Sequence, residues 1–395
     1  MQLPMNTPVV PKKKTWSWRG RAFRGLIYQV VALTVIGMVI WFLAHNTMEN
    51  MRVRGIQSGF DFLSQPAGFD IGEGLIPFNS SQNYWTAFLV GLLNTLRVAI
   101  IGIILTTILG TLIGVGRFSR NALVRGLCIS YVELFRNIPI LLQLLTWYLL
   151  LTQVLPPADE AWVIGHLFLS KGGLNFPLPI WATGHLWALA GLVAGLCAGW
   201  IYRRWAFHRF ESTGVVRSMF WLPVLITLLG GAAGWLLGGA PGDFNMPFKG
   251  EFAIEQGGAL TPEFIAVLLG LTLYTAAFVA EVVRAGIQSV SQGQGEAASA
   301  LGLSRGHVMR LVMLPQALRV IIPPMTNQYL NLTKNSSLAV AIGYPDVVSI
   351  ANTALNQTGR AVECIAIVMA VYLTTSLITS AFMNWYNARA AIKER

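Results

Sequence analysis

The chain has 395 residues, of which 54% are hydrophobic and 11% are charged, whereas an ordinary soluble domain has about 45 to 50% apolar and about 25% charged residues. This composition excludes a soluble globular protein and indicates an integral membrane protein. The net charge of +11 does not indicate nucleic-acid binding, because the Lys and Arg side chains lie in short clusters beside apolar runs rather than along one face or tail.

Eight apolar runs are each long enough to cross a bilayer, which takes about 20 residues. They are read at 26–44, 86–114, 131–153, 183–201, 218–239, 262–287, 310–343 and 362–385. The first run follows a basic stretch but ends without a small-x-small cleavage pattern, so we expect it to remain as an anchor. The predicted fold is an all-α integral membrane protein with about eight transmembrane helices.

The distribution of basic residues predicts the orientation of these helices. If the N-terminus is cytoplasmic, 21 Lys and Arg residues fall in inside segments and five fall in outside segments. Because short cytoplasmic loops carry an excess of Lys and Arg, we expect a multi-pass protein with both termini in the cytoplasm.

The chain divides into five predicted regions. They are a cytoplasmic basic tail at 1–25, a first span and outer loop at 26–84, a first core part at 85–154, an inserted helical hairpin at 155–261, and a second core part at 262–395. The three cysteines have spacings that match neither a disulfide framework nor a metal site, so no metal is predicted.

A polar and glycine-bearing passage near 288–315 interrupts the second core part. We expect a glycine turn at 293–295, a short helix with Glu296 near its N-terminus, where a negative charge suits the helix dipole, and a stop at Gly302. A second short helix would include Arg305, and the two helices at a right angle would form a compact knob. The alternative is an ordinary interfacial helix with arginines that set the topology. The residues assigned to this passage are Gly295, Glu296, Ala297, Ala298, Gly302, Arg305, Leu314 and Pro315.

The chain lacks the sequence needed to hold nucleotide phosphates. No G-x-x-x-x-G-K-[ST] motif and no Gly-Lys dipeptide occurs, so the backbone cradle and the lysine of a P-loop are missing. We therefore expect no ATPase activity and no enzyme in this chain, and any energy for transport would come from another subunit or an ion gradient.

Four stretches resemble the permease subunits of the polar amino acid family of ABC importers, which includes histidine, glutamine, arginine and general amino acid permeases. They are 91–96, 133–143, the passage 296–319 with its E-A-A-x3-G-x9-[IV]-x-L-P spacing, and 334–338. The chain has Asn-Ile at 137–138 where the family usually has Gly-Thr, and Asn-Ser-Ser at 335–337 where it usually has Asp-Thr-Ser. The long first loop and the extra hairpin are similar to the general L-amino acid branch.

This resemblance implies a type I ABC importer permease core in a bacterial inner membrane. It implies that the passage 288–315 is a docking loop for an ATPase, and that the partners are two ATPase subunits, which bind ATP and Mg²⁺, a second permease subunit, homologous or identical, and a periplasmic amino-acid-binding protein. No cofactor in this chain and no nucleic-acid partner is implied. An ion-coupled secondary transporter and a non-transporting membrane scaffold remain alternatives.

Polar residues within the spans are candidates for the substrate path or its gate. Pro139 and the pair at 323–324 remove helix hydrogen bonds, so we expect kinks or breaks there. Asn327, Asn331, Lys334 and Asn335 recur at helical spacing of three or four, which puts them on one face. Polar contacts between spans are the alternative for that face, and an ion pair or a snorkelling side chain is the alternative for the arginine at position 97. The candidates are Arg97, Glu133, Arg136, Pro139, Gln143, Tyr274, Glu281, Asn327, Asn331, Lys334, Asn335, Ser336 and Ser337.

Overall fold

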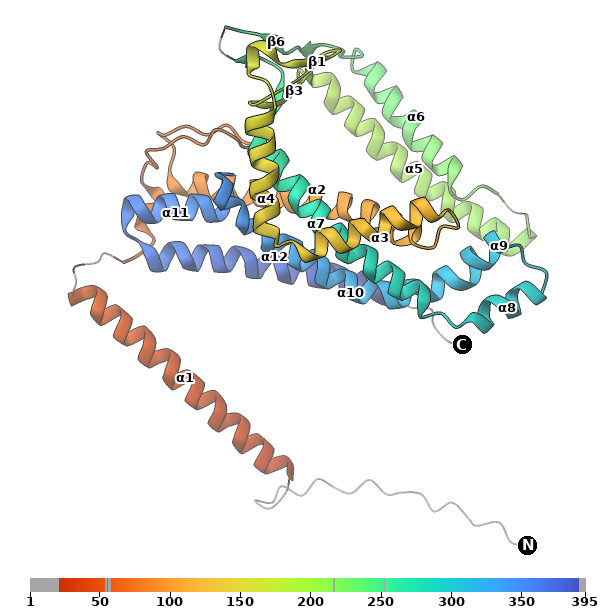
Figure 1. Ribbon diagram of the computed structural model, residues 1–395, viewed down its shortest axis with the longest axis horizontal. Helices are drawn as coiled ribbons and strands as arrows, with labels where there is room; N and C mark the ends of the chain where they lie inside the picture. Colours follow the sequence, from red (N-terminus) through yellow and green to blue (C-terminus); the bar gives the residue numbers. More distant parts are fainter. Residues whose placement is uncertain (1–20, 54, 56–57, 216, 252, 391–395) are drawn as a thin grey trace.

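The computed structural model describes residues 21–390, except 54, 56, 57, 216 and 252. Most of the predicted basic tail therefore lies outside the described residues. Within them the chain is mainly helical, and most of the long helices lie together in one bundle (Figure 1). The helical pair within 183–237 leans away from this bundle, and the first helix stands apart from both. The helices are α1 (Arg21–Val53), α2 (Tyr84–Gly116), α3 (Ala122–Asn137), α4 (Ile140–Leu149), α5 (Thr183–Thr213), α6 (Trp221–Leu237), α7 (Pro262–Gln288), α8 (Gln292–Ala300), α9 (Arg305–His307), α10 (Leu314–Asn335), α11 (Val347–Thr358) and α12 (Ala361–Ala390).

The predicted number of eight spans is not confirmed. Six segments in the described part of the chain are long and apolar enough to cross a bilayer: α1, α2, α5, α7, the segment Val308–Ile342 that contains α10, and α12. The pair α3 and α4 adds a seventh only if its two bent halves count as one span. Helix α6 has 17 residues, fewer than the roughly 20 that a span needs, so its crossing stays a prediction.

The predicted third span, 131–153, is not a continuous helix. Helix α3 stops at Asn137, and the helix that resumes at Ile140 runs at 104° to it. Ile138 is extended (φ −94°, ψ 127°) because the ring of Pro139 disfavours helical geometry in the residue before it. The Nε2 of Gln143 donates to the carbonyls of Phe135 and Ile138, at 2.9 Å each, and so satisfies acceptors that the end of α3 leaves free. The kink expected at Pro139 is confirmed.

Helix α10 is not broken at positions 323–324, where a kink or a break was expected. Helix α10 runs through Pro323 and Pro324 to Asn335 and then tightens into a 3₁₀ segment, Ser336–Ile342. Ile321 and Met325 flank the prolines and are packed in a core cluster with Val279 of α7. This packing holds the helix together where its own hydrogen bonds are missing.

The core forms where α2 lies against α7. Gly114 of α2 touches α7 so closely that a Cβ there would lie 2.8 Å from the carbonyl oxygen of Ala280 and from the Cβ of Val283. Both helices begin at a side-chain cap: Asn83 accepts from the backbone N–H of Thr86 at 2.9 Å, and the Thr261 hydroxyl caps α7. The caps fix where each helix begins, and the small residues fix how close they come.

Short strands, absent from the all-α prediction, connect the helices of the predicted insertion to the core. They form an antiparallel sheet in the order β1-β2-β3-β8 and two further pairs, β4-β5 and β6-β7. Strand β3 pairs with β8, so that Phe176 faces Gly258 across the ladder. The strands are β1 (Trp162–Ile164), β2 (Leu167–Ser170), β3 (Gly173–Phe176), β4 (Leu178–Pro179), β5 (Phe244–Asn245), β6 (Phe248–Lys249), β7 (Ile254–Glu255) and β8 (Gly258–Leu260).

Helices α5 and α6 form a closely packed antiparallel pair. Gly191 and Gly195 of α5 lie against Gly230, Gly234 and Thr227 of α6, and a Cβ on either α5 glycine would meet backbone atoms of α6 within 3.0 Å. This is the small-residue contact typical of helices that associate in a membrane. The outward faces of both helices carry exposed Leu, Val and Trp side chains.

Candidate functional site

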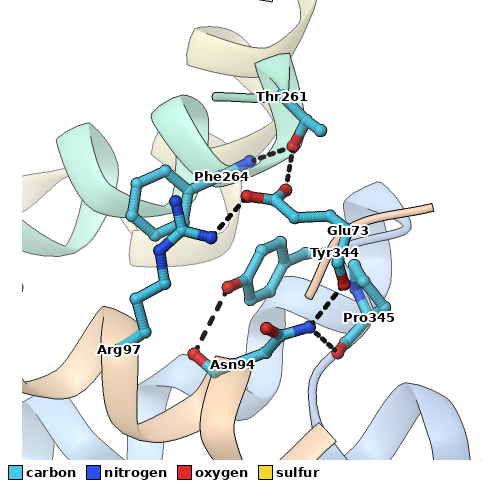
Figure 2. A network of polar contacts seen from close by, with 7 residues as sticks. All are labelled: Glu73, Asn94, Arg97, Thr261, Phe264, Tyr344 and Pro345. Carbon is cyan, nitrogen blue, oxygen red and sulfur yellow. Dashed lines mark hydrogen bonds and ion pairs between the residues drawn. The ribbon is translucent and has the colours of Figure 1, made fainter. Parts of the chain in front are cut away.

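Arg97 of α2 is held in a polar network near the start of α7 (Figure 2). Its guanidinium donates to the carboxylate of Glu73 at 2.8 Å and lies 4.0 Å from the centre of the Phe264 ring. The other carboxylate oxygen of Glu73 accepts a hydrogen bond from the Thr261 hydroxyl, which also caps α7. Of the alternatives left open by the sequence, the structure shows an ion pair.

The same network connects the loop between α1 and α2 to the segment before α11. The Nδ2 of Asn94 donates to the backbone carbonyls of Glu73 and Pro345, at 2.9 Å each, and the hydroxyl of Tyr344 donates to the backbone carbonyl of Asn94 at 3.3 Å. Asn94 and Tyr344 are fully buried. These contacts connect the loop between α1 and α2, helix α2 itself, the start of α7 and the chain after α10.

Sequence reasoning missed Glu73 as a site residue. Burial raises the pKa of the Glu73 carboxyl above its ordinary value, while the hydrogen bond from Thr261 and the charge of Arg97 oppose that shift. Glu73 lies in an outer loop, 24 positions from Arg97. The available signal was a charge within a span, which requires a partner, but nothing in the sequence identifies which acid provides it.

A second charged network lies near the C-terminal end of α7. The carboxylate of Glu281 forms ion pairs with Arg117 at the end of α2 and with Arg284 one turn further along α7. Arg136 at the end of α3 lies 3.9 Å from the same carboxylate. One carboxylate thus faces three guanidinium groups, which leaves a surplus of positive charge.

Three predicted path residues meet in this region. The guanidinium of Arg136 lies 5.3 Å from the centre of the Phe278 ring, and the ring of Tyr274 lies 4.9 Å from that of Phe278. Arg136, Tyr274 and Glu281 are therefore brought together along α7. Glu133 is exposed on α3 and lies outside this group.

Helix α10 exposes three of the four residues that the spacing predicts on its polar face. Asn327, Asn331 and Lys334 are exposed, whereas Leu332 and Thr333 are buried. Asn335 is half-buried at the end of the same helix. Because exposed amide and ammonium groups are unfavourable against lipid, this face requires water or a partner protein.

The serines that end this run have local roles. The hydroxyl of Ser336 donates to the carbonyl of Thr333 at 2.7 Å, and that of Ser337 donates to the carbonyl of Lys334 at 2.8 Å. Both bonds satisfy carbonyls at the end of α10. Ser336 is buried, and neither serine extends the exposed polar face.

The short helix in the passage near 288–315 begins about one turn earlier than expected. Helix α8 starts at Gln292 after the extended residue Ser291, so the glycine turn expected at 293–295 is wrong and those residues form the first turn of the helix. Glu296 is the fifth residue of α8 rather than near its start. Glycine is tolerated in an exposed helical turn at a cost of about 1 kcal/mol, and so did not stop the helix.

The end of α8 is as expected. Gly302 has φ +79°, a conformation that glycine adopts without strain, and its N–H donates to the carbonyl of Ser299 at 3.0 Å. The N–H of Leu303 donates to the carbonyl of Ala298 at 3.3 Å, which completes a Schellman motif. Leu301 at this corner is 84% exposed.

The loop is joined directly to α10. The second short helix, α9, is a single turn that opens at Arg305 and continues through a π-helical segment, Val308–Met313, into α10 at Leu314 and Pro315. Glu296 and Ala297 are exposed, whereas Ala298 is buried. The two short helices and α10 thus follow one another along the chain with only the corner at 301–304 between them.

Comparisons with known proteins agree in the kind of protein they match. The family model described as "binding-protein-dependent transport system inner membrane component" matches residues 102–392. The chain is 46% identical to the general L-amino acid transport system permease protein AapQ of Rhizobium johnstonii, over 96% of both chains. It is 45% identical to the putative amino-acid ABC transporter permease protein YhdX of Escherichia coli, over 97% of this chain and 98% of that one. It is 40% identical to the glutamate/glutamine/aspartate/asparagine transport system permease protein BztB of Rhodobacter capsulatus, over 94% of this chain and 95% of that one.

Proposed function

Because the chain belongs to the family of binding-protein-dependent transport system inner membrane components, we propose that it is the membrane subunit through which an ATP-driven importer moves L-amino acids into the bacterial cytoplasm. The choice of cargo rests on the three relatives, which are named for amino acids and are similar along nearly their whole length. The protein spans the membrane several times, and we place it in the bacterial inner membrane with both termini inside.

The observation that carries the proposal is the exposed docking loop and its direct connection to α10. An exposed small-residue helix with Leu301 at its corner suits insertion into a groove on an ATPase. From Leu314 to Asn331 the helix extends about 25 Å, at about 1.5 Å per residue. Closure of the ATPases on ATP and Mg²⁺ would move α8, and α10 would transmit that movement to its polar face.

The remaining partners follow from the same proposal. Two ATPase subunits bind the docking loops of this chain and of a second permease subunit, homologous or identical, and a periplasmic binding protein delivers the amino acid to the outer side. The exposed face of α10 with Asn327, Asn331 and Lys334 then lines the path between the two permease subunits. Hydrolysis of ATP occurs in the ATPase subunits, and this chain is not an enzyme.

The test is amino-acid-stimulated ATP hydrolysis by the purified membrane complex in lipid. We expect Glu296→Lys and Gly302→Pro to abolish stimulated hydrolysis and to release the ATPase subunits. Glu251→Lys is the matched control, because it makes the same charge change at another exposed position and should leave both activities intact. Retention of both the ATPase and uptake by the two loop variants would reject the docking role and favour ion-coupled transport.

A further inference from the structure

A basic and aromatic hollow lies at the end of α5 that faces away from the sheet. It is a cavity of about 670 Å³, lined by seven side chains. These are Trp200, Arg203, Arg204, Phe207, His208, Glu211 and Met219. In Figure 1 this end of the α5/α6 pair lies on the same side of the molecule as α8 and α9, the side that the excess of basic residues predicts to be cytoplasmic.

Within the part of the chain that the structure describes, the two arginines of the hollow form no ion pair with an acidic side chain. The guanidinium of Arg204 lies 4.1 Å from the centre of the Trp200 ring. Among the described residues, neither Arg203 nor Arg204 lies within 4.0 Å of a carboxylate, and the acid nearest in sequence, Glu211, is 3.9 Å from His208 instead. Two adjacent guanidinium groups with free donors are suited to a phosphate oxygen.

An apolar groove continues from this hollow between the two helices. It is a cavity of about 300 Å³ that shares Trp200 and Arg203 with the hollow. Its walls are otherwise apolar or small, formed by Leu196, Gly199, Pro223, Val224, Thr227 and Leu228. The two cavities together therefore present a charged end and an adjoining apolar end.

We propose that this composite site binds one anionic phospholipid of the inner leaflet, with its phosphate on Arg203 and Arg204 and one acyl chain in the groove. The charge matches the anionic headgroups at the cytoplasmic surface. The groove requires an apolar chain attached to the phosphate, which a free anion does not have. The site lies outside the docking loop and the polar face of α10, so the inference does not depend on the nature of the cargo.

Native mass spectrometry of the purified transport complex tests this site. After exchange into detergent with either phosphatidylglycerol or phosphatidylcholine of equal chain length, we expect the wild type to retain phosphatidylglycerol selectively. Arg203→Gln/Arg204→Gln should lower its affinity by about 30-fold, since one basic residue near an anionic surface contributes about fivefold. Arg120→Gln/Arg125→Gln is the control, because it removes the same charge from exposed positions of another predicted inside loop.

Two further arms separate a lipid site from other occupants. Val224→Trp fills the groove and should weaken retention of long-chain phosphatidylglycerol while leaving a short-chain form unaffected. Inorganic phosphate should not displace the long-chain lipid. Three lipid-binding outcomes would each overturn the proposal: displacement by phosphate, equal retention of phosphatidylcholine, or unchanged lipid binding in Arg203→Gln/Arg204→Gln. Loss of the ATPase from that variant while its lipid is retained would also overturn it.

Discussion

Arg97 shows how a charge is accommodated in the middle of a membrane helix. An unpaired charge at such a position costs a few kcal/mol, and here Glu73 and the ring of Phe264 offset that cost. The sequence identified the problem, because an arginine interrupts an apolar run. It did not identify the partner, because the acid lies in an irregular loop whose path depends on the tertiary fold.

Removal of one member of this pair should destabilise the protein more than removal of both. Arg97 and Glu73 are 15% and 8% exposed, and breaking a buried pair on one side costs about 3 to 5 kcal/mol because the other charge stays buried. We expect Arg97→Gln to lower the thermal midpoint in detergent clearly and Arg97→Gln/Glu73→Gln to recover part of the loss. Equal midpoints for Arg97→Gln and the exposed control Arg125→Gln would contradict this role.

Asp346 predicts a pH-dependent stability. It lies between the last two long helices, and burial raises its pKa from 3.8 to about 7, although hydrogen bonds from the backbone N–H of Ser349 and from Tyr372 oppose the shift. A carboxyl with a raised pKa in the folded state binds its proton more tightly there than in the unfolded chain. The contribution of this carboxyl to the free energy of unfolding is therefore fully present below about pH 4 and is lost as the pH rises to about 7.

The measurement is the thermal midpoint between pH 4 and pH 8 in detergent. The thermal midpoint of the wild type should fall as the pH rises from about 4 to about 7. The midpoint of Asp346→Asn should fall less, and this variant keeps a side-chain acceptor for the cap of α11. Asp70→Asn, at an exposed outer-loop position whose carboxylate accepts from Ser80, controls for a general loss of charge. A wild-type profile that Asp346→Asn reproduces in full would rule out this contribution.

At the scale of single elements, the C-terminal end of a helix was easier to predict than its first residue. Gly302 ends α8 as expected because a left-handed corner has few solutions other than glycine. The start was misplaced because Gly293 and Gly295 were interpreted as a turn, whereas an exposed helix tolerates both. Likewise Pro139 predicted a kink, but the bend of 104° also involves the carbonyls to which Gln143 donates. The sequence does not reveal those partners.

Close contact between α2 and α7 predicts a strong difference between two helical glycines. A side chain at Gly114 would clash with the carbonyl of Ala280, whereas nothing lies within 4 Å of a Cβ at Gly126 of α3. We expect Gly114→Val to reduce the yield of folded protein severely, and Gly126→Val to have little effect, as judged by size-exclusion chromatography in detergent. Similar elution profiles for both variants would show that α2 and α7 do not pack this closely.

At the scale of the whole molecule, apolar runs predicted most of the long helices but none of the sheet. Strands of two to four residues contain too few positions for an alternating pattern to be recognised. The pairing of β3 with β8 joins positions about 80 residues apart, and such contacts depend on the fold rather than on local sequence. The sequence therefore predicted an extra helical pair without predicting how it is attached.

The antiparallel pairing of Phe176 with Gly258 predicts that the α5/α6 pair can be removed cleanly. Replacement of residues 177–257 by Asn-Gly would join β3 to β8 through a two-residue hairpin turn. We expect the shortened chain to assemble with its ATPase and to keep amino-acid-stimulated hydrolysis, but to lose selective retention of phosphatidylglycerol.

The matched control replaces the same residues with Asn-Gly in a chain that also carries Gly302→Pro. This control should be inserted into the membrane but should not bind the ATPase. Failure of the simple excision to accumulate in the membrane, with the full-length chain accumulating normally, would show that the insertion is needed for the core to fold.

The loop after α1 limits how far that helix can lie from the rest of the protein. The backbone N–H of Gly59 donates to the carboxylate of Glu363 at 2.6 Å, and Arg360 donates to the Gly59 carbonyl at 3.2 Å, so the chain is anchored at the start of α12. Only five residues separate Gly59 from Val53, the last residue of α1, and they reach at most about 20 Å. None of the apolar span of α1 is buried. Its last residue, Val53, nevertheless stays within about 20 Å of Gly59, so α1 can occupy only positions in the bilayer close to α12.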